Sequence, residues 1–192
     1  MKGLIKVVRG SAVILACLLI VYQAAPAKGN FAKKGVIELG GSLGYSSQTS
    51  VYGSQTGSTT STIQLSPYFG YFLSDGFELG VDPFSILSMS SGGSSITQIM
   101  FLVAPSYNFT TNGSVYPFVE ALLGYTSISG GGETGGGFSW GLKGGIKINV
   151  TGNGLLNFGL QYAQYTYTPS GASERYGFNT ISLSGGFTIF FN

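Results

Sequence analysis

The fold is decided by residues 138–150, FSWGLKGGIKINV, where large apolar residues alternate with small or polar ones. In an extended chain Phe138 and Trp140 fall on one face, and Ser139 and Lys143 fall on the other. A period of two predicts a β-strand whose two faces meet different surroundings. The stretch exceeds the roughly 5–6 residues of most strands in soluble proteins. It is long enough for a tilted strand that crosses a membrane, which needs about 9–11 residues.

The remainder of the chain repeats this pattern, and no segment after residue 27 has the 3.6-residue apolar period of a helix. The further strands are predicted at residues 35–46, 62–73, 77–87, 97–109, 115–126, 155–167 and 178–191. Short connections rich in Gly and Asn alternate with longer ones: the short ones cover 74–76, 110–114 and 151–154, and the long ones 47–61, 88–96, 127–136 and 168–177. This alternation is typical of an outer-membrane barrel, which has short periplasmic turns and longer outer loops.

Composition excludes several classes of function. The chain has 192 residues, which fits one domain, and only 8% of them are charged, whereas a soluble domain has about 25%. Nine basic residues against seven acidic ones do not make the basic surface of a nucleic-acid binder. The absence of His removes the Ser-His-Asp triad, the Cys-His dyad and His-ligated zinc. We therefore expect no enzyme, no catalytic residue, no metal and no cofactor.

Residues 1–27 have the three parts of a secretory signal peptide. Lys2, Lys6 and Arg9 precede the apolar run 11–22, and Ala-Pro-Ala at 25–27 supplies a cleavage site. Cleavage would leave residues 28–192 as the barrel domain, with six basic and seven acidic residues. An uncleaved N-terminal anchor is one alternative.

The only cysteine, Cys17, lies inside the apolar run. Lipidation of this residue is the second alternative to a cleaved signal peptide. Cleavage after residue 27 would instead remove the thiol, which suits an oxidising compartment.

The strands need a place for their apolar faces. In lipid every backbone donor and acceptor must be paired, so a sheet has to close into a barrel. In water eight strands can instead close over an apolar interior, as in lipocalins. The second face of these strands carries Gly, Ser, Thr, Asn, Gln, Glu and Lys, which is too polar for a soluble core. The sequence therefore predicts an all-β, eight-stranded antiparallel up-and-down transmembrane β-barrel with its apolar face toward lipid.

Aromatic residues gather near the predicted strand ends, where two girdles at the lipid interfaces would lie. Those beside the short turns are Tyr71, Phe77, Tyr107 and Phe109, and those beside the long loops are Tyr45, Tyr125, Phe138 and Trp140. Prolines fall inside the proposed strands at Pro67, Pro83, Pro105 and Pro117. Because proline cannot donate to a ladder, we expect bulges or strand ends there.

Four stretches resemble one family of proteins: SPYFGYFLSDGFELGV (66–81), YPFVEALLGYTS (116–127), FSWGLKGGIKINV (138–150) and SLSGGFTIFF (182–191). The chain resembles the small eight-stranded outer-membrane barrels of Gram-negative bacteria, the OmpA/OmpX and opacity-protein group. The resemblance implies an integral outer-membrane protein, a monomer in contact with lipid and lipopolysaccharide, inserted by the barrel-assembly machinery. Family members typically end in an aromatic residue, whereas here Phe191 is next to last and Asn192 ends the chain.

Six charged residues fall on the inward face of the predicted strands: Glu38, Glu78, Asp82, Glu120, Lys143 and Lys147. Pairing Tyr125 with Phe138 across the third long connection puts Glu120 opposite Lys143. An eight-stranded barrel is just wide enough to be filled by side chains. We therefore hypothesise an internal plug of ion pairs and hydrogen bonds. The alternative is a charged constriction that gates a small pore.

The leading functional interpretation is a non-enzymatic surface or structural protein whose four outer loops contact the outside. The connection 47–61 is uncharged and rich in Ser, Thr, Gly and Gln, as expected of a solvated, mobile loop. Loops on a rigid scaffold also carry binding sites, so an unknown extracellular ligand is the functional interpretation of the same segment. The rival functions are a small passive channel for ions or solutes and a soluble periplasmic ligand-binding barrel.

Overall fold

The computed structural model describes residues 31–192, except 53–54, 91–94, 112, 131–132, 172–175 and 192. The proposed leader, including Cys17, lies outside the described residues. No helix within the described part is long and apolar enough to cross a membrane.

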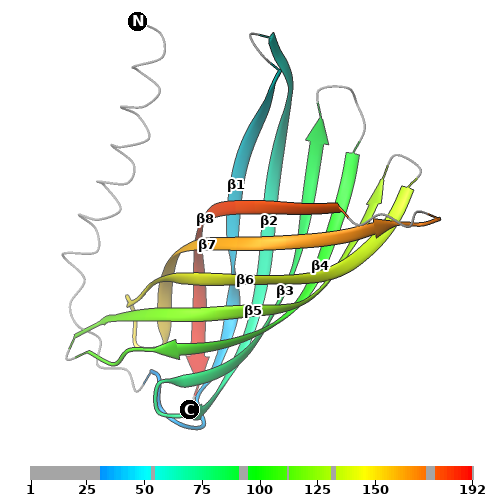
Figure 1. The fold of residues 1–192 in the computed structure, drawn as a ribbon. Helices are drawn as coiled ribbons and strands as arrows, with labels where there is room; N and C mark the ends of the chain where they lie inside the picture. The colour runs from blue at the N-terminus through cyan, green and yellow to red at the C-terminus, as the bar shows by residue number, and fades with distance from the viewer. Residues whose placement is uncertain are drawn as a thin grey trace, which may run out of the picture.

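Eight antiparallel strands form a closed barrel, in which each strand pairs with the next along the chain and β8 pairs with β1 (Figure 1). The strands are β1 (Ile37–Tyr52), β2 (Gln55–Ser74), β3 (Phe77–Ser90), β4 (Ser95–Asn108), β5 (Val115–Gly130), β6 (Glu133–Asn149), β7 (Gly154–Pro169) and β8 (Tyr176–Phe191). The predicted fold class is confirmed. We call the end that carries the short turns after β2, β4 and β6 the turn end, and the opposite end the loop end.

The predicted long loops are wrong in conformation. Only residues 53–54, 91–94, 131–132 and 170–175 separate the strands at the loop end. Within the predicted loop 47–61, for example, Gln48 still pairs with Thr60. Alternation fades from the sequence there because a strand beyond the membrane meets water on both faces, while its backbone groups still require partners. The apolar pattern therefore marks the membrane-spanning part of each strand rather than the whole strand.

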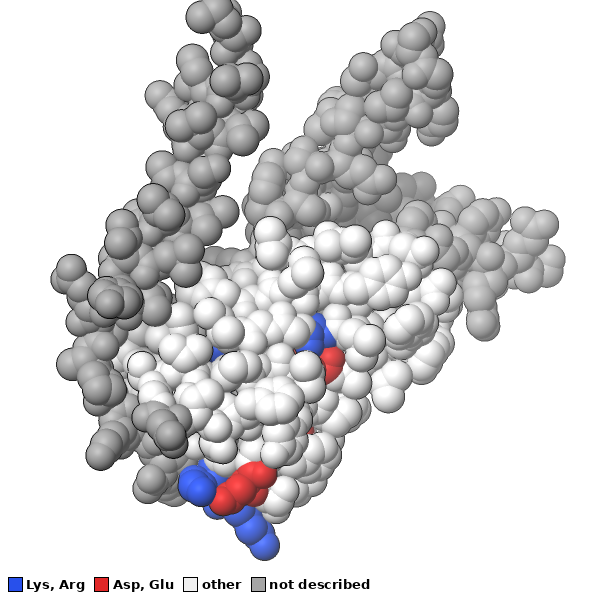
Figure 2. Space-filling view, turned by 60° about the vertical axis from the view of Figure 1, so that its left-hand side comes forward, with Lys and Arg blue, Asp and Glu red and all other residues white. Residues whose placement is uncertain are grey.

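The apolar faces of the strands point outward. Ile181 and Leu183 of β8 are 71% and 70% exposed, while Glu38 and Glu78 are completely buried. Large apolar side chains are exposed around the whole described barrel, and Figure 2 shows one face of this wall almost without charge.

The aromatic residues predicted for the two girdles are exposed, apart from Tyr45, whose side chain lies outside the description. They are Tyr71, Phe77, Tyr107, Phe109, Tyr125, Phe138 and Trp140. This outward placement is the one that a lipid-facing barrel requires.

The four strand prolines do not end strands, and no register shift is recorded beside them. The residue pairing of β2 with β3 is interrupted around Pro67 and Pro83, and that of β4 with β5 around Pro105. Pro117 pairs with Ile146 without interruption. Since proline has no N–H to donate, a local gap in the ladder is its expected effect, and the expectation of strand ends is wrong.

The seam that closes the barrel is shorter than the other seven. Pairing of β1 with β8 runs from Ile37 opposite Phe191 to Gly44 opposite Ser184. Beyond Gly44 the strand β1 continues with β2 alone, and Figure 1 shows the outer parts of β1 and β8 running apart. Closure of the ring therefore depends on the half of the seam that is nearest the turn end.

Candidate functional site in the barrel lumen

The chain just before β1 folds back into the turn end of the barrel. We call residues 31–36 the N-terminal stopper. Backbone hydrogen bonds fasten it to the end of β2: Gly35 N–H donates to the Phe72 carbonyl oxygen, and Phe72 N–H donates to that of Val36, each over 2.9 Å. Gly35 has φ 88°, a left-handed conformation that glycine adopts without cost. The reversal at this glycine directs the preceding residues into the mouth of the barrel.

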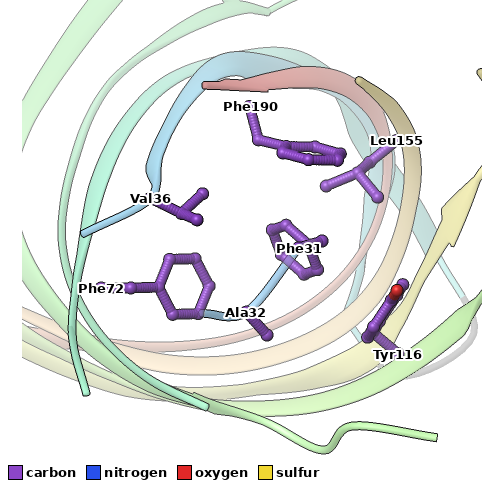
Figure 3. Close-up of a cluster of buried hydrophobic side chains, with 7 residues drawn as sticks. All are labelled: Phe31, Ala32, Val36, Phe72, Tyr116, Leu155 and Phe190. Atoms are coloured by element: carbon purple, nitrogen blue, oxygen red, sulfur yellow. The ribbon is translucent and has the colours of Figure 1, made fainter. Parts of the chain in front are cut away.

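Phe31 fills the centre of that mouth and is only 2% exposed. Its ring lies edge-on to Tyr116 at 4.9 Å and to Phe72 at 5.2 Å, and tilted against Phe190 at 5.3 Å between ring centroids. Such edge-to-face pairs stabilise beyond the burial of their area. Figure 3 shows the complete cluster inside the ring of strands: Phe31, Ala32, Val36, Phe72, Tyr116, Leu155 and Phe190.

An exposed ion pair fastens the stopper from outside. Lys33 Nζ lies 2.8 Å from Asp75 Oδ2 in the turn between β2 and β3, and the Lys34 backbone N–H donates to Asp75 Oδ1 over 3.0 Å. The hydrogen bond from Lys33, followed by that from the Lys34 backbone, lowers the pKa of the Asp75 carboxyl. Both charged side chains are more than half exposed, so this contact orients the stopper and adds little stability.

Directly inside the stopper, Lys147 lies between two carboxylates. Its Nζ is 2.6 Å from Glu38 Oε2 and 3.3 Å from Glu78 Oε2. We call these three residues the lower triad. Thr188 Oγ1 on β8 donates to the second oxygen of Glu38 over 2.6 Å. The triad therefore joins β1, β3, β6 and β8 across the lumen.

Neutral groups complete the surroundings of the lower triad. Asn108 Nδ2 and Ser106 Oγ on β4 donate to Glu78 Oε2 over 3.0 and 3.1 Å. Three rings lie within cation–π range of the Lys147 ammonium, at 5.2–5.4 Å: those of Phe31, Tyr68 and Phe118. Phe31 therefore belongs both to the stopper and to the surroundings of the buried charge.

A second triad lies nearer the loop end. Lys143 Nζ is 3.2 Å from Glu120 Oε1 and 3.8 Å from Asp82 Oδ2. We call these residues the upper triad. Its lysine is 14% exposed, while its two acids are 2% and 3% exposed. Asp82 Oδ1 is buried without a hydrogen-bond partner among the described residues.

An apolar layer on the strands β4, β5 and β7 shares the lumen with the triads. It consists of Met100, Leu102, Ala104, Leu122, Ala163 and Tyr165, with Tyr68 packed against it. Further toward the loop end, the buried hydroxyls of Thr126 and Ser139 form a hydrogen bond. Around the triads a cavity of only about 30 Å³ is left, which is room for a few water molecules at most.

All six charged residues that the sequence placed in the lumen lie inside the barrel, divided between the two triads. The predicted register is confirmed, since Glu120 lies opposite Lys143 and Tyr125 opposite Phe138. The link between Lys147 and Glu38, which are 109 residues apart, was not predicted. Alternation along each strand places both side chains inward, but only the closed barrel brings them to the same level along its axis.

The stopper was also not predicted. The first strand was predicted to begin at residue 35, and no role was predicted for Phe31. The available signal was an isolated aromatic residue ahead of the first strand, followed by a glycine at position 35 that permits a reversal. No group of three or more His, Cys, Asp or Glu side chains in the described part of the chain could hold a metal ion.

No protein-family model matches the chain, and no curated protein sequence matches it. Solved structures do match. The crystal structure of Neisserial surface protein A is 17% identical, with a TM-score of 0.63, over 81% of this chain and 97% of that one. The N-terminal β-barrel domain of Pseudomonas aeruginosa OprF is 18% identical, with a TM-score of 0.53, over 82% and 98%. The chain therefore has the fold of the small eight-stranded outer-membrane barrels.

Proposed function

We propose that this chain is a non-enzymatic, integral outer-membrane barrel protein whose role is structural or surface-interacting. The observation that carries the proposal is the filled lumen. The stopper, the two triads and the apolar layer occupy the interior one after another, and the cavity among the triads measures about 30 Å³. With the described part of the interior occupied in this way, the outer surface and the outer strand ends are available for function.

The location is supported by the outside of the barrel. Large apolar side chains are exposed around the described wall, which in water would be an aggregation surface and in lipid is the required surface. This argues against the soluble periplasmic barrel. We further propose export by a cleaved signal peptide at residues 1–27, insertion by the barrel-assembly machinery, and contact with lipid and lipopolysaccharide as a monomer.

The outer strand ends are the candidate contact surface. The pairing of β1 with β2 continues to Tyr52 opposite Gln55, so this hairpin runs on beyond Gly44, where β1 stops pairing with β8. Residues 47–61 contain no charged residue. We propose that an extracellular ligand recognised here would be bound through hydroxyl, amide and backbone groups rather than through charge.

Single-channel recording in planar bilayers tests the closed lumen. Folding of the purified full chain is first established by its heat-dependent shift on a gel. We expect a folded, inserted and electrically silent protein. Discrete conductance steps that change with Glu120→Gln would favour the passive channel. Asp75→Asn is the comparison variant for the exposed turn end: conductance steps that respond to it as strongly as to Glu120→Gln would not be assigned to the luminal charges.

A further inference from the structure

The charges in the lumen do not balance. The lower triad has two carboxyl groups, Glu38 and Glu78, for one ammonium group, and the upper triad repeats this ratio with Asp82 and Glu120 around Lys143. If all six groups were ionised, each triad would carry one excess negative charge. The described lumen as a whole would then carry two.

In the part of the chain that the structure describes, nothing else that faces the triads supplies the missing positive charge. The titratable and polar groups that face them are Glu38 and Ser42 on β1, Ser66 and Tyr68 on β2, Glu78 and Asp82 on β3, Ser106 and Asn108 on β4, Glu120 on β5, Lys143 and Lys147 on β6, Asn157 and Tyr165 on β7, and Ser184 and Thr188 on β8. The other described charges, Lys33, Lys34 and Asp75, belong to the exposed turn end. Among the described residues, therefore, no positive charge balances this excess.

Burial makes this balance necessary. The four acids are 0–3% exposed, and an uncompensated charge removed from water to this extent is strongly destabilising. Asp82 Oδ1 is buried without a partner, and Asp82, Glu120 and Lys143 together line the 30 Å³ cavity. The described acids do not form a group that could hold a metal ion. A proton is the smallest cation and needs no such set of ligands.

We propose that each triad binds one proton, shared by its two carboxyl groups beside the lysine ammonium. The folded barrel then carries two protons, taken up from the solvent, which the unfolded chain releases at neutral pH. Each triad becomes electrically neutral: one carboxylate pairs with the ammonium, and the other carboxyl group is a neutral acid that can donate a hydrogen bond. In the upper triad that donor can satisfy an oxygen that otherwise has no partner.

The chain offers a clean pH window for a test. It contains no His, so between about pH 5.5 and 7 no ordinary side chain of the unfolded protein titrates. The folded state binds two more protons than the unfolded state, and stability therefore falls as pH rises. We expect the equilibrium constant for urea unfolding of the full chain in detergent micelles to rise with pH in this window, by up to about 100-fold per pH unit.

Isosteric variants show how much each triad contributes to the pH dependence of the unfolding equilibrium constant. Asp82→Asn and Glu38→Gln each remove one proton-binding group, so each reduces the dependence to at most about tenfold per pH unit, and the double variant shows none. Asp75→Asn is the matched control and keeps the full slope, because that carboxyl lies on the exposed turn. A wild-type slope near zero would overturn the proposal. So would a loss of stability when choline replaces Na⁺ at constant ionic strength, since the balancing charge would then be a bound cation.

Infrared spectroscopy of the folded barrel gives a second test that does not depend on reversible unfolding. A protonated carboxyl group has a C=O stretching band separate from the bands of carboxylates. We expect this band at pH 6.5, weakened in Asp82→Asn and in Glu38→Gln and unchanged in Asp75→Asn. A wild-type spectrum that shows carboxylates alone would refute proton binding.

Discussion

Replacement of Phe31 by alanine tests whether the N-terminal stopper contributes to the stability of the barrel. The side chain is 2% exposed and contacts three other rings at 4.9–5.3 Å. A buried Phe→Ala change costs about 3–5 kcal/mol through lost transfer free energy and an unfilled cavity. Because the stopper lies at the mouth of the barrel, water can enter the space, which favours the lower figure. We expect the free energy of unfolding to fall by about 3 kcal/mol.

The assay is equilibrium urea unfolding in detergent micelles, followed by the fluorescence of the single tryptophan, Trp140. Phe31→Leu is the matched variant, since it keeps an apolar side chain of similar reach and loses the ring contacts, which are worth about 0.5–1.5 kcal/mol. A graded loss, smaller for leucine than for alanine, supports the packing argument. If Phe31→Ala loses less than about 1 kcal/mol, the reasoning is refuted, because that is below the range for a filled apolar site.

Three further predictions concern the lumen, the wall and the turn end. Lys147→Met leaves Glu38 and Glu78 without their ammonium and lowers the free energy of unfolding in urea by about 3–5 kcal/mol. The Lys143 side chain is 14% exposed and that of Lys147 only 5%, so we expect Lys143→Met to cost less; a larger loss for Lys143→Met would contradict this reasoning. A Cβ atom on Gly145 would overlap the backbone of β7, whereas one on Gly152 meets open space, so G145A lowers the yield of heat-shifted folded protein and G152A leaves it unchanged. An NMR titration will find the pKa of the Asp75 carboxyl below the ordinary value of about 3.9, and K33A will raise it. Because the pKa of the Asp75 carboxyl is lower in the folded protein than in the unfolded one, its contact with Lys33 stabilises the fold at pH values above the unfolded pKa. This stabilisation is lost as pH falls through the folded pKa. A titration curve that K33A leaves unchanged would contradict this origin of the shift.

The sequence was most informative where the chain meets lipid. Alternation at Phe138, Trp140 and Leu142 predicted the outward face of β6, and the same parity set Glu120 opposite Lys143. These predictions succeed because hydrocarbon requires an apolar side chain at every second residue of a membrane-spanning strand. Beyond the membrane both faces meet water, so the pattern disappears although the strand continues, and residues 47–52 of β1 were predicted as a loop.

Contacts across the lumen could not be predicted from the alternation of apolar and polar residues along single strands. Glu38 and Lys147 come together only because the barrel closes. Alternation along a strand tells which face of the sheet a side chain lies on, but not its level along the barrel axis. Phe31 lies before the first strand, where no period exists to assign it. Its position depends on the reversal at Gly35 and on the rings of Phe72 and Phe190, which come from β2 and β8.

The short seam between β1 and β8 determines how the barrel can close during folding. Its ladder joins the beginning of the barrel to its end, and the hydrogen bond from Thr188 to Glu38 spans 150 residues. Each hairpin can form from neighbouring sequence within microseconds, but the last joint must wait until seven strands are aligned, and a contact so distant along the chain makes folding slow. Until then β1 and β8 each present a free edge that hydrocarbon does not tolerate. Those edges therefore have to be covered until the ring closes.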